Sequence, residues 1–121
     1  MKANTIIYWI TTAIISLMML SVAYQYMTNP KMAETFAHLG FPSYFRIELA
    51  CAKVIGALVL IIPGIPPRIK NWAYAGFGIT FISAAIAHFN SGDPTKMIMT
   101  PLIVFAILII SYVCGYKLNK V

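Results

Sequence analysis

Charged residues inside apolar stretches are the side chains of this sequence with the clearest capacity for chemistry. The stretch of residues 44–62 carries Arg46, Glu48 and Lys53, and His88 lies near the end of a later stretch. An ionised group at the centre of a membrane costs roughly 2.5–3.5 kcal/mol on insertion scales, so each such residue is a candidate for function. Arg46 lies within a turn of the expected boundary and can extend to the lipid headgroups, whereas Lys53 lies about 13 Å deep. Lys53 therefore has the greatest need of a partner.

The ionisable residues inside the expected spans are predicted to form ion pairs or hydrogen bonds with one another. Glu48 and Lys53 point about 140° apart on a helix, so they are poorly placed to pair within it. Helical side chains lean toward the helix N-terminus, which brings Lys53 and His88 to a similar depth from opposite directions. We predict one polar cluster of Glu48, Lys53 and His88, with Asp93 in a nearby loop as a helix cap. Two roles are open to it, a structural hydrogen-bond or ion-pair network and a ligand or proton site.

Catalytic and metal-binding patterns do not occur in the sequence. Cys51 and Cys114 lie in apolar stretches without a CxxC pair, Cys/His ligand spacing or a nucleophile signature, and are expected to be small buried residues. The second histidine, His38, lies outside these stretches, so a pair of inward axial ligands for a haem is not expected. We therefore predict no catalytic residue and no metal site.

The composition indicates a membrane protein. Of the 121 residues, 60% are apolar and 10% are charged, whereas soluble domains average roughly 45–50% and 25%. The net charge of +6 is spread along the chain, without the basic and aromatic runs of a nucleic-acid-binding surface. Short polar segments separate the apolar stretches, so residues 1–121 are expected to form a single domain.

Four apolar stretches are expected to cross the membrane: residues 5–27, 44–62, 72–89 and 97–116. At 1.5 Å per residue the first is about 34 Å long, enough for a hydrocarbon core of about 30 Å. A cleavable signal peptide is the rival interpretation, but the stretch continues beyond the small-residue site at Ala23. Asn29-Pro30 and Gly40 predict a short surface helix over residues 31–39. The predicted fold is all-α: an integral membrane four-helix bundle with a short surface helix between the first and second spans.

Two local patterns describe how the later spans begin and pack. Asn71 and Asp93 are expected to cap the third and fourth spans. Within the third span a residue suited to close helix packing in lipid recurs at every fourth position; the stripe consists of Gly76, Thr80, Ala84 and His88.

The basic residues predict the orientation. One side of the expected membrane carries five of them, namely Lys2, Arg68, Lys70, Lys117 and Lys120. The loops of the other side carry Lys31 and Lys96, with Arg46 at a helix entrance. Since cytoplasmic loops are enriched in Lys and Arg, both termini are predicted to be cytoplasmic, in a plasma (inner) membrane.

Several short segments occur in a combination that is specific when taken together. They are Tyr8-Trp9, Leu39-Gly40-Phe41-Pro42, Lys53-Val54-Ile55-Gly56-Ala57, Ile62-Pro63-Gly64, Trp72-Ala73-Tyr74-Ala75-Gly76, His88 and Gly92-Asp93-Pro94. In this combination almost the whole chain resembles the DoxX-like family of small four-helix membrane proteins. That family takes its name from a membrane subunit associated with thiosulfate:quinone oxidation, and some distant relatives look like assembly chaperones for membrane receptors. Most members have no assigned activity, so the resemblance implies the fold and supplies no catalytic residues.

Two functions are compatible with these features. A membrane bundle with a helix-packing stripe and no cofactor motif favours an accessory, scaffolding or chaperone-like protein that acts with a membrane protein partner or as a homo-oligomer. The alternative is the membrane subunit of a quinone-linked oxidoreductase, in which a quinone is the cofactor that the resemblance admits. On its own the chain is not expected to be an enzyme.

Overall fold

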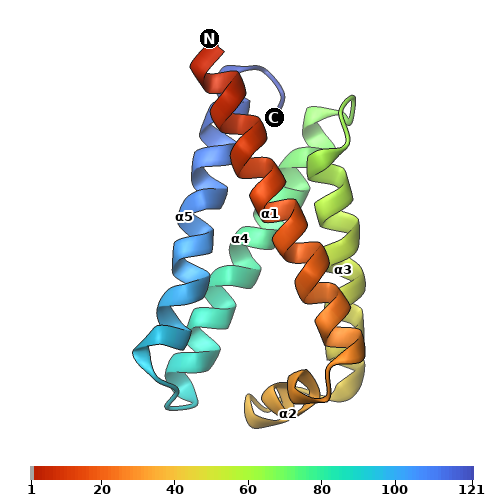
Figure 1. The fold of residues 1–121 in the computed structure, drawn as a ribbon, viewed down its shortest axis with the longest axis vertical. Helices are drawn as coiled ribbons and strands as arrows, with labels where there is room; N and C mark the ends of the chain where they lie inside the picture. Colours follow the sequence, from red (N-terminus) through yellow and green to blue (C-terminus); the bar gives the residue numbers. More distant parts are fainter. Residues whose placement is uncertain (1) are drawn as a thin grey trace.

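The computed structural model describes residues 2–121, which form five helices and no strand. The helices are α1 (Lys2–Thr28), α2 (Pro30–His38), α3 (Ser43–Ile61), α4 (Pro67–Asn90) and α5 (Thr95–Lys117). The four longer helices lie side by side, and α2 lies across one end of them (Figure 1). The prediction of an all-α fold with a short helix after the first long one is confirmed.

The boundaries of α2 follow from the residues that mark them in the sequence. The Asn29 side chain accepts a hydrogen bond of 3.0 Å from the backbone N–H of Lys31, and Pro30 is the first helical residue. Gly40, which follows the helix, has a φ of 87°, a left-handed conformation that glycine adopts without steric cost. The start and stop signals of this helix were therefore correctly predicted.

Three helices are long and apolar enough to cross a membrane, namely α1, α4 and α5. The 19-residue α3 is not one of them, because it carries Arg46, Glu48 and Lys53. It nevertheless lies alongside α1 in the same assembly of helices (Figure 1). A chain with three such helices is an integral membrane protein.

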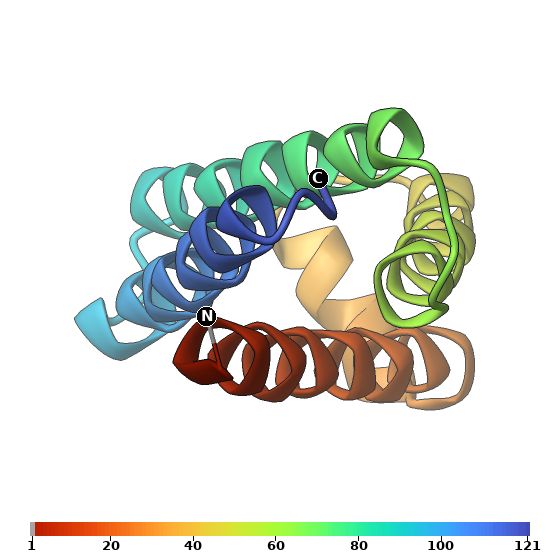
Figure 2. The ribbon, with the colours of Figure 1, turned by 90° about the horizontal axis from the view of Figure 1, so that it is seen from above.

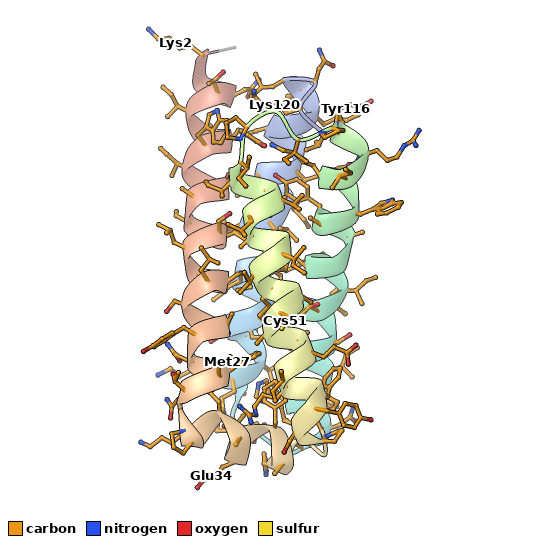
Figure 3. All side chains as sticks on the ribbon, turned by 90° about the vertical axis from the view of Figure 1, so that its right-hand side faces the viewer. Lys2, Met27, Glu34, Cys51, Tyr116 and Lys120 are labelled. Carbon is orange, nitrogen blue, oxygen red and sulfur yellow. The ribbon has the colours of Figure 1, made fainter. Side chains whose placement is uncertain are left out.

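The two ends of the molecule differ in charge. Both termini and the α3–α4 loop lie at one end, whereas α2 and the α4–α5 turn lie at the other (Figure 1). Lys2 and Lys120 are at the first end and Glu34 is at the opposite one (Figure 3). We refer to the end with the termini as the basic end and to the other as the α2 end. The alternation of helix directions matches the order expected from the sequence.

Glycine allows close packing at positions other than the predicted stripe. A Cβ at Gly56 of α3 would lie 2.7 Å from a ring carbon of Phe77 on α4, and one at Gly115 of α5 would lie 2.8 Å from the ring of Tyr8 on α1. A Cβ at Gly76 would meet no atom within 4 Å. Among residues 2–121 no other helix packs closely against Gly76, so the stripe that begins there faces outward at this point. Seen from above, the four long helices surround an elongated interior (Figure 2).

Three expectations about single residues were wrong. Helix α4 begins at Pro67, so Asn71 lies inside its first turns and does not cap it. The residue before α5 is Pro94, and no side chain caps that helix, so Asp93 is not its cap. Cys114 is buried as expected, but Cys51 is exposed on α3, because the rotation of α3 turns this position away from the other helices (Figure 3).

Candidate functional site

Lys53 is a buried cation between three helices. It belongs to the inward face of α3 together with Ala50, Ala57 and Leu60, a spacing of three to four residues that places side chains on one side of a helix. The lysine is only 4% exposed. Because water does not reach the Lys53 side chain, only neighbouring protein groups can balance its charge.

The ammonium of Lys53 is surrounded by apolar and aromatic groups. Its Nζ lies 3.7 Å from the Met19 sulfur on α1. It also lies 5.7 Å from the ring centroid of Tyr26 and 5.8 Å from that of Phe81. Ring faces and thioether sulfur attract a cation weakly. Within residues 2–121 no carboxylate lies within 4 Å of this ammonium.

Glu48 does not join Lys53. Its side chain is exposed, and among the described residues it forms no hydrogen bond or ion pair with Lys53 or His88. The two residues differ by about 140° around the helix axis, so the rotation that buries Lys53 turns Glu48 outward. The predicted arrangement of Glu48, Lys53 and His88 as one cluster is therefore not the one observed.

His88 pairs instead with Asp93. The Nδ1 of His88 lies 2.7 Å from one carboxylate oxygen of Asp93, and the Nε2 of His38, on α2, lies 2.9 Å from the other. A carboxylate only accepts hydrogen bonds, so both imidazoles donate. The hydrogen bond from His88, with a smaller contribution from His38, lowers the pKa of the Asp93 carboxyl below its usual value. Asp93 thus connects α2 to the end of α4, a role that its expected position as a cap did not reveal.

A second polar group lies inside the basic half of the molecule. Lys70 is 3% exposed, and its ammonium donates a hydrogen bond of 2.9 Å to the Tyr8 hydroxyl. The Ser111 hydroxyl lies 2.7 Å from that of Thr12 and 2.6 Å from that of Tyr74. Because a hydroxyl donates and accepts at once, Ser111 links α1, α4 and α5 through a continuous set of buried hydrogen bonds.

Sequence reasoning missed these residues although a signal was present. Lys70 lies outside the expected span of residues 72–89, but α4 begins earlier, at Pro67, because proline is tolerated at the first helical position. The hydroxyl residues Tyr8, Thr12 and Ser16 recur every fourth position of α1, which is the period of one helix face. This repeat indicates an inward polar stripe, as the hydrogen bond of 3.2 Å from Ser16 to the carbonyl of Ala57 also shows.

An open groove of about 390 Å³ runs along the outside of α3 and α4. Many of its lining residues are small, and among residues 2–121 Lys53 is the only charged residue that lines it. Its lining includes Ala52, Lys53, Gly56, Ala73, Gly76 and Thr80. We call it the α3–α4 groove.

The fold and the polar groups define an integral membrane protein with a buried lysine beside a groove of small residues. The sequence matches the model of the DoxX-like family over residues 9–111, and the chain belongs to this family. Neither the curated proteins nor the solved structures contain a match to the chain.

Proposed function

We propose that this chain is an accessory protein of the membrane that binds a transmembrane helix of a partner protein in the α3–α4 groove. In this proposal α3 crosses the membrane beside α1, α4 and α5, and the chain serves to hold or stabilise its partner. The single observation that supports it best is the exposed carboxylate of Glu48 on a helix that packs among membrane-spanning helices.

Glu48 lies in line with the groove. Positions 48, 52, 55 and 59 follow the spacing of one helix face, and Ala52, Ile55 and Val59 line the groove. A carboxylate that faces lipid is unfavourable, so ionisable groups in spans are usually paired. A partner helix in the groove would bring a basic or other hydrogen-bond-donating side chain to Glu48.

The small residues of the groove suit a helix as the occupant. Helices in lipid associate where glycine and alanine let their backbones approach closely. Gly76 has no neighbouring atom within 4 Å of where its Cβ would lie, so its surface is open to a second helix. The predicted stripe of residues 76, 80, 84 and 88 would then act between proteins.

The test uses a photoreactive residue in place of Ile55, which is 64% exposed and lines the groove. The matched control is Ile103 on α5, which is 57% exposed and lies outside the groove. In native membranes we expect one defined heterologous product from position 55 and none from position 103, and Glu48→Gln should reduce its yield. Identical products from both positions, or a product made only of two copies of this chain, would contradict the proposal.

A second candidate, a quinone-linked subunit, is favoured by the surroundings of Lys53. An ammonium held near two aromatic rings is suited to donate a hydrogen bond to the carbonyl of a membrane-dissolved quinone. Lipid extraction of protein purified in mild detergent tests this candidate. A stoichiometric quinone that is lost in Lys53→Met would support it, and quinone at the level of an unrelated membrane protein would exclude it.

A further inference from the structure

The most exposed large apolar side chains are sorted by type along the long axis of the molecule. Among residues 2–121 seven of them are 67–73% exposed, and they belong to Leu17, Tyr24, Tyr44, Trp72, Ile79, Phe89 and Tyr116. The five aromatic residues lie near the ends of long helices, whereas Leu17 and Ile79 lie near the middle of α1 and α4. Rings are thus exposed toward both ends of the molecule and aliphatic chains between them.

The exposed rings form two belts, each taken from different helices. At the α2 end they are Tyr24 near the end of α1, Tyr44 at the start of α3 and Phe89 at the end of α4 (Figure 1). At the basic end they are Trp72 near the start of α4 and Tyr116 at the end of α5, which Figure 3 labels. We call them the α2-end belt and the basic-end belt.

The order of side chains at the basic end matches the order of groups across half a bilayer. Arg68 lies one turn before Trp72, and Lys117 directly follows Tyr116; both cations are exposed. Trp and Tyr are enriched where the hydrocarbon meets the headgroups, and Lys and Arg extend further out. Going outward from the middle of the molecule, aliphatic chains, rings and cations therefore occupy positions that suit acyl chains, headgroups and phosphates.

Helix α4 carries one ring of each belt, so it gives their separation. Trp72 and Phe89 are 17 positions apart in the sequence, which is about 26 Å at 1.5 Å per residue. The helix is inclined to the long axis of the molecule (Figure 1), so along that axis the two rings are no further apart than this. A typical hydrocarbon core is about 30 Å thick. The belts of this molecule therefore enclose a layer that is several ångströms thinner.

We propose that the two belts form a lipid-contacting surface that fits a bilayer with a hydrocarbon layer of about 25 Å, thinner than the average membrane. The basic-end belt lies among the headgroups of one leaflet, with Arg68 and Lys117 at its phosphates. The α2-end belt lies among the headgroups of the other leaflet, and α2 lies outside the hydrocarbon. This placement does not depend on the partner proposed for the α3–α4 groove.

Tryptophan fluorescence tests the position of the belts in vesicles of dimyristoleoylphosphatidylcholine. Three proteins with a single tryptophan are compared: Trp9→Phe, which keeps Trp72, and two that also carry Trp72→Phe together with Phe89→Trp or Ile79→Trp. Ile79 is the matched control, because it is as exposed as the belt residues but lies at the middle of α4. Added lipids carry bromine either near the headgroup or near the end of the acyl chain.

We expect the shallow bromines to quench the tryptophans at positions 72 and 89 roughly twofold more than the deep ones, and the reverse at position 79. Circular dichroism confirms that the three proteins keep their helices. Stronger quenching by deep bromines at position 72 or 89, or the same depth at all three positions, would overturn the proposal.

Bilayers of different thickness test the separation of the belts in the unaltered protein. It is reconstituted into dimyristoleoyl-, dioleoyl- and dierucoylphosphatidylcholine, whose acyl chains increase in length in this order, and thermal unfolding is followed by circular dichroism. A bilayer that is too thick must thin around the protein, at a modest cost for each ångström of mismatch. We expect the midpoint of unfolding to be highest in the thinnest bilayer and to fall by roughly 3–6 °C up to the thickest. Equal midpoints in the three bilayers, or a maximum in either of the two thicker ones, would contradict the proposed thickness.

Discussion

Lys53 shows at the scale of one residue how a helix can bury a charged side chain without an acid beside it. The lysine is buried, and its ammonium faces the Met19 sulfur and the rings of Tyr26 and Phe81. Interactions of this kind are weaker than an ion pair with a hydrogen-bonded carboxylate. We therefore expect the buried charge of Lys53 to add little to stability or to reduce it.

The first prediction concerns the removal of this charge. Methionine is unbranched and of similar length, so Lys53→Met removes the ammonium while it fills the same space. Replacing a buried charged group by a well-packed apolar one is often neutral or stabilising. We expect a free energy of unfolding that is unchanged or about 1 kcal/mol higher, measured by thermal unfolding in detergent. A loss of more than about 1 kcal/mol would mean that the ammonium has a strong partner.

Contacts between helices decide which glycines the fold requires. A Cβ at Gly56 would lie 2.7 Å from the Phe77 ring, whereas one at Gly76 would meet no atom within 4 Å. The Phe77 ring is itself buried in the core, so it has little room to move. Gly56 is therefore required by the packing of α3 on α4, and Gly76 is not.

The second prediction compares these two glycines. Gly56→Ala should destabilise the protein by about 1–3 kcal/mol, because overpacking displaces neighbouring side chains. Gly76→Ala should be neutral or stabilise by up to about 1 kcal/mol, because alanine favours a helix more than glycine does. Thermal unfolding of both variants in the same detergent measures the difference. Similar effects at the two positions would contradict the observed packing of α3 on α4.

Helix α2 is held at two points. Phe36 is its buried residue, and its ring packs edge-on against Tyr26 at 4.9 Å between centroids. His38, the last residue of the same helix, bonds to Asp93, which also bonds to His88. The polar tether thus joins α2 to the α4–α5 turn across the α2 end of the molecule.

The third prediction concerns the pH dependence of this tether. Because hydrogen bonds from His88 and His38 lower the pKa of Asp93 in the folded protein, its carboxylate contributes stability above its unfolded pKa of about 3.9. This contribution is lost as the pH falls through the lower folded value. We expect the distance between spin labels at Lys31 and Lys96, in a variant without Cys51 and Cys114, to stay constant down to about pH 4 and to broaden below it.

Asp93→Asn is the control for the tether, because its amide cannot serve as a charged acceptor for two imidazoles. It should show the broad distance distribution already at neutral pH. A narrow distribution in this variant at every pH would show that Phe36 alone holds α2 in place.

The distribution of charge over the whole molecule predicts its orientation. Lys2, Arg68, Lys117 and Lys120 belong to the segments at the basic end, and Glu34 lies at the opposite end (Figure 3). Positively charged segments are retained in the cytoplasm during insertion. Both termini are therefore expected to be cytoplasmic.

The fourth prediction tests this orientation with single cysteines in a background without Cys51 and Cys114. Ala3 and Thr95 are both exposed and lie at opposite ends of the molecule. An impermeant thiol reagent added to intact cells should label Thr95→Cys and spare Ala3→Cys, and both should react after lysis. Labelling of Ala3→Cys alone would reverse the proposed topology.

The sequence by itself determined the helical class, the membrane environment and the limits of α2. These features depend on local signals, namely long apolar stretches, the Asn29-Pro30 start and the glycine at position 40. Each signal acts within a few residues or within one helix. No knowledge of the neighbouring helices is needed to interpret it.

Only the tertiary structure decided how each helix is rotated about its own axis. This rotation turns Lys53 inward and Glu48 outward, places Gly56 rather than Gly76 at a helix contact, and buries Lys70 against Tyr8. The apolar residues of a membrane helix surround it on every side, so the lipid-facing and the inward face differ little in hydrophobicity. The packing of side chains against the other helices selects the face that is buried. The sequence of one helix carries no direct information about that packing.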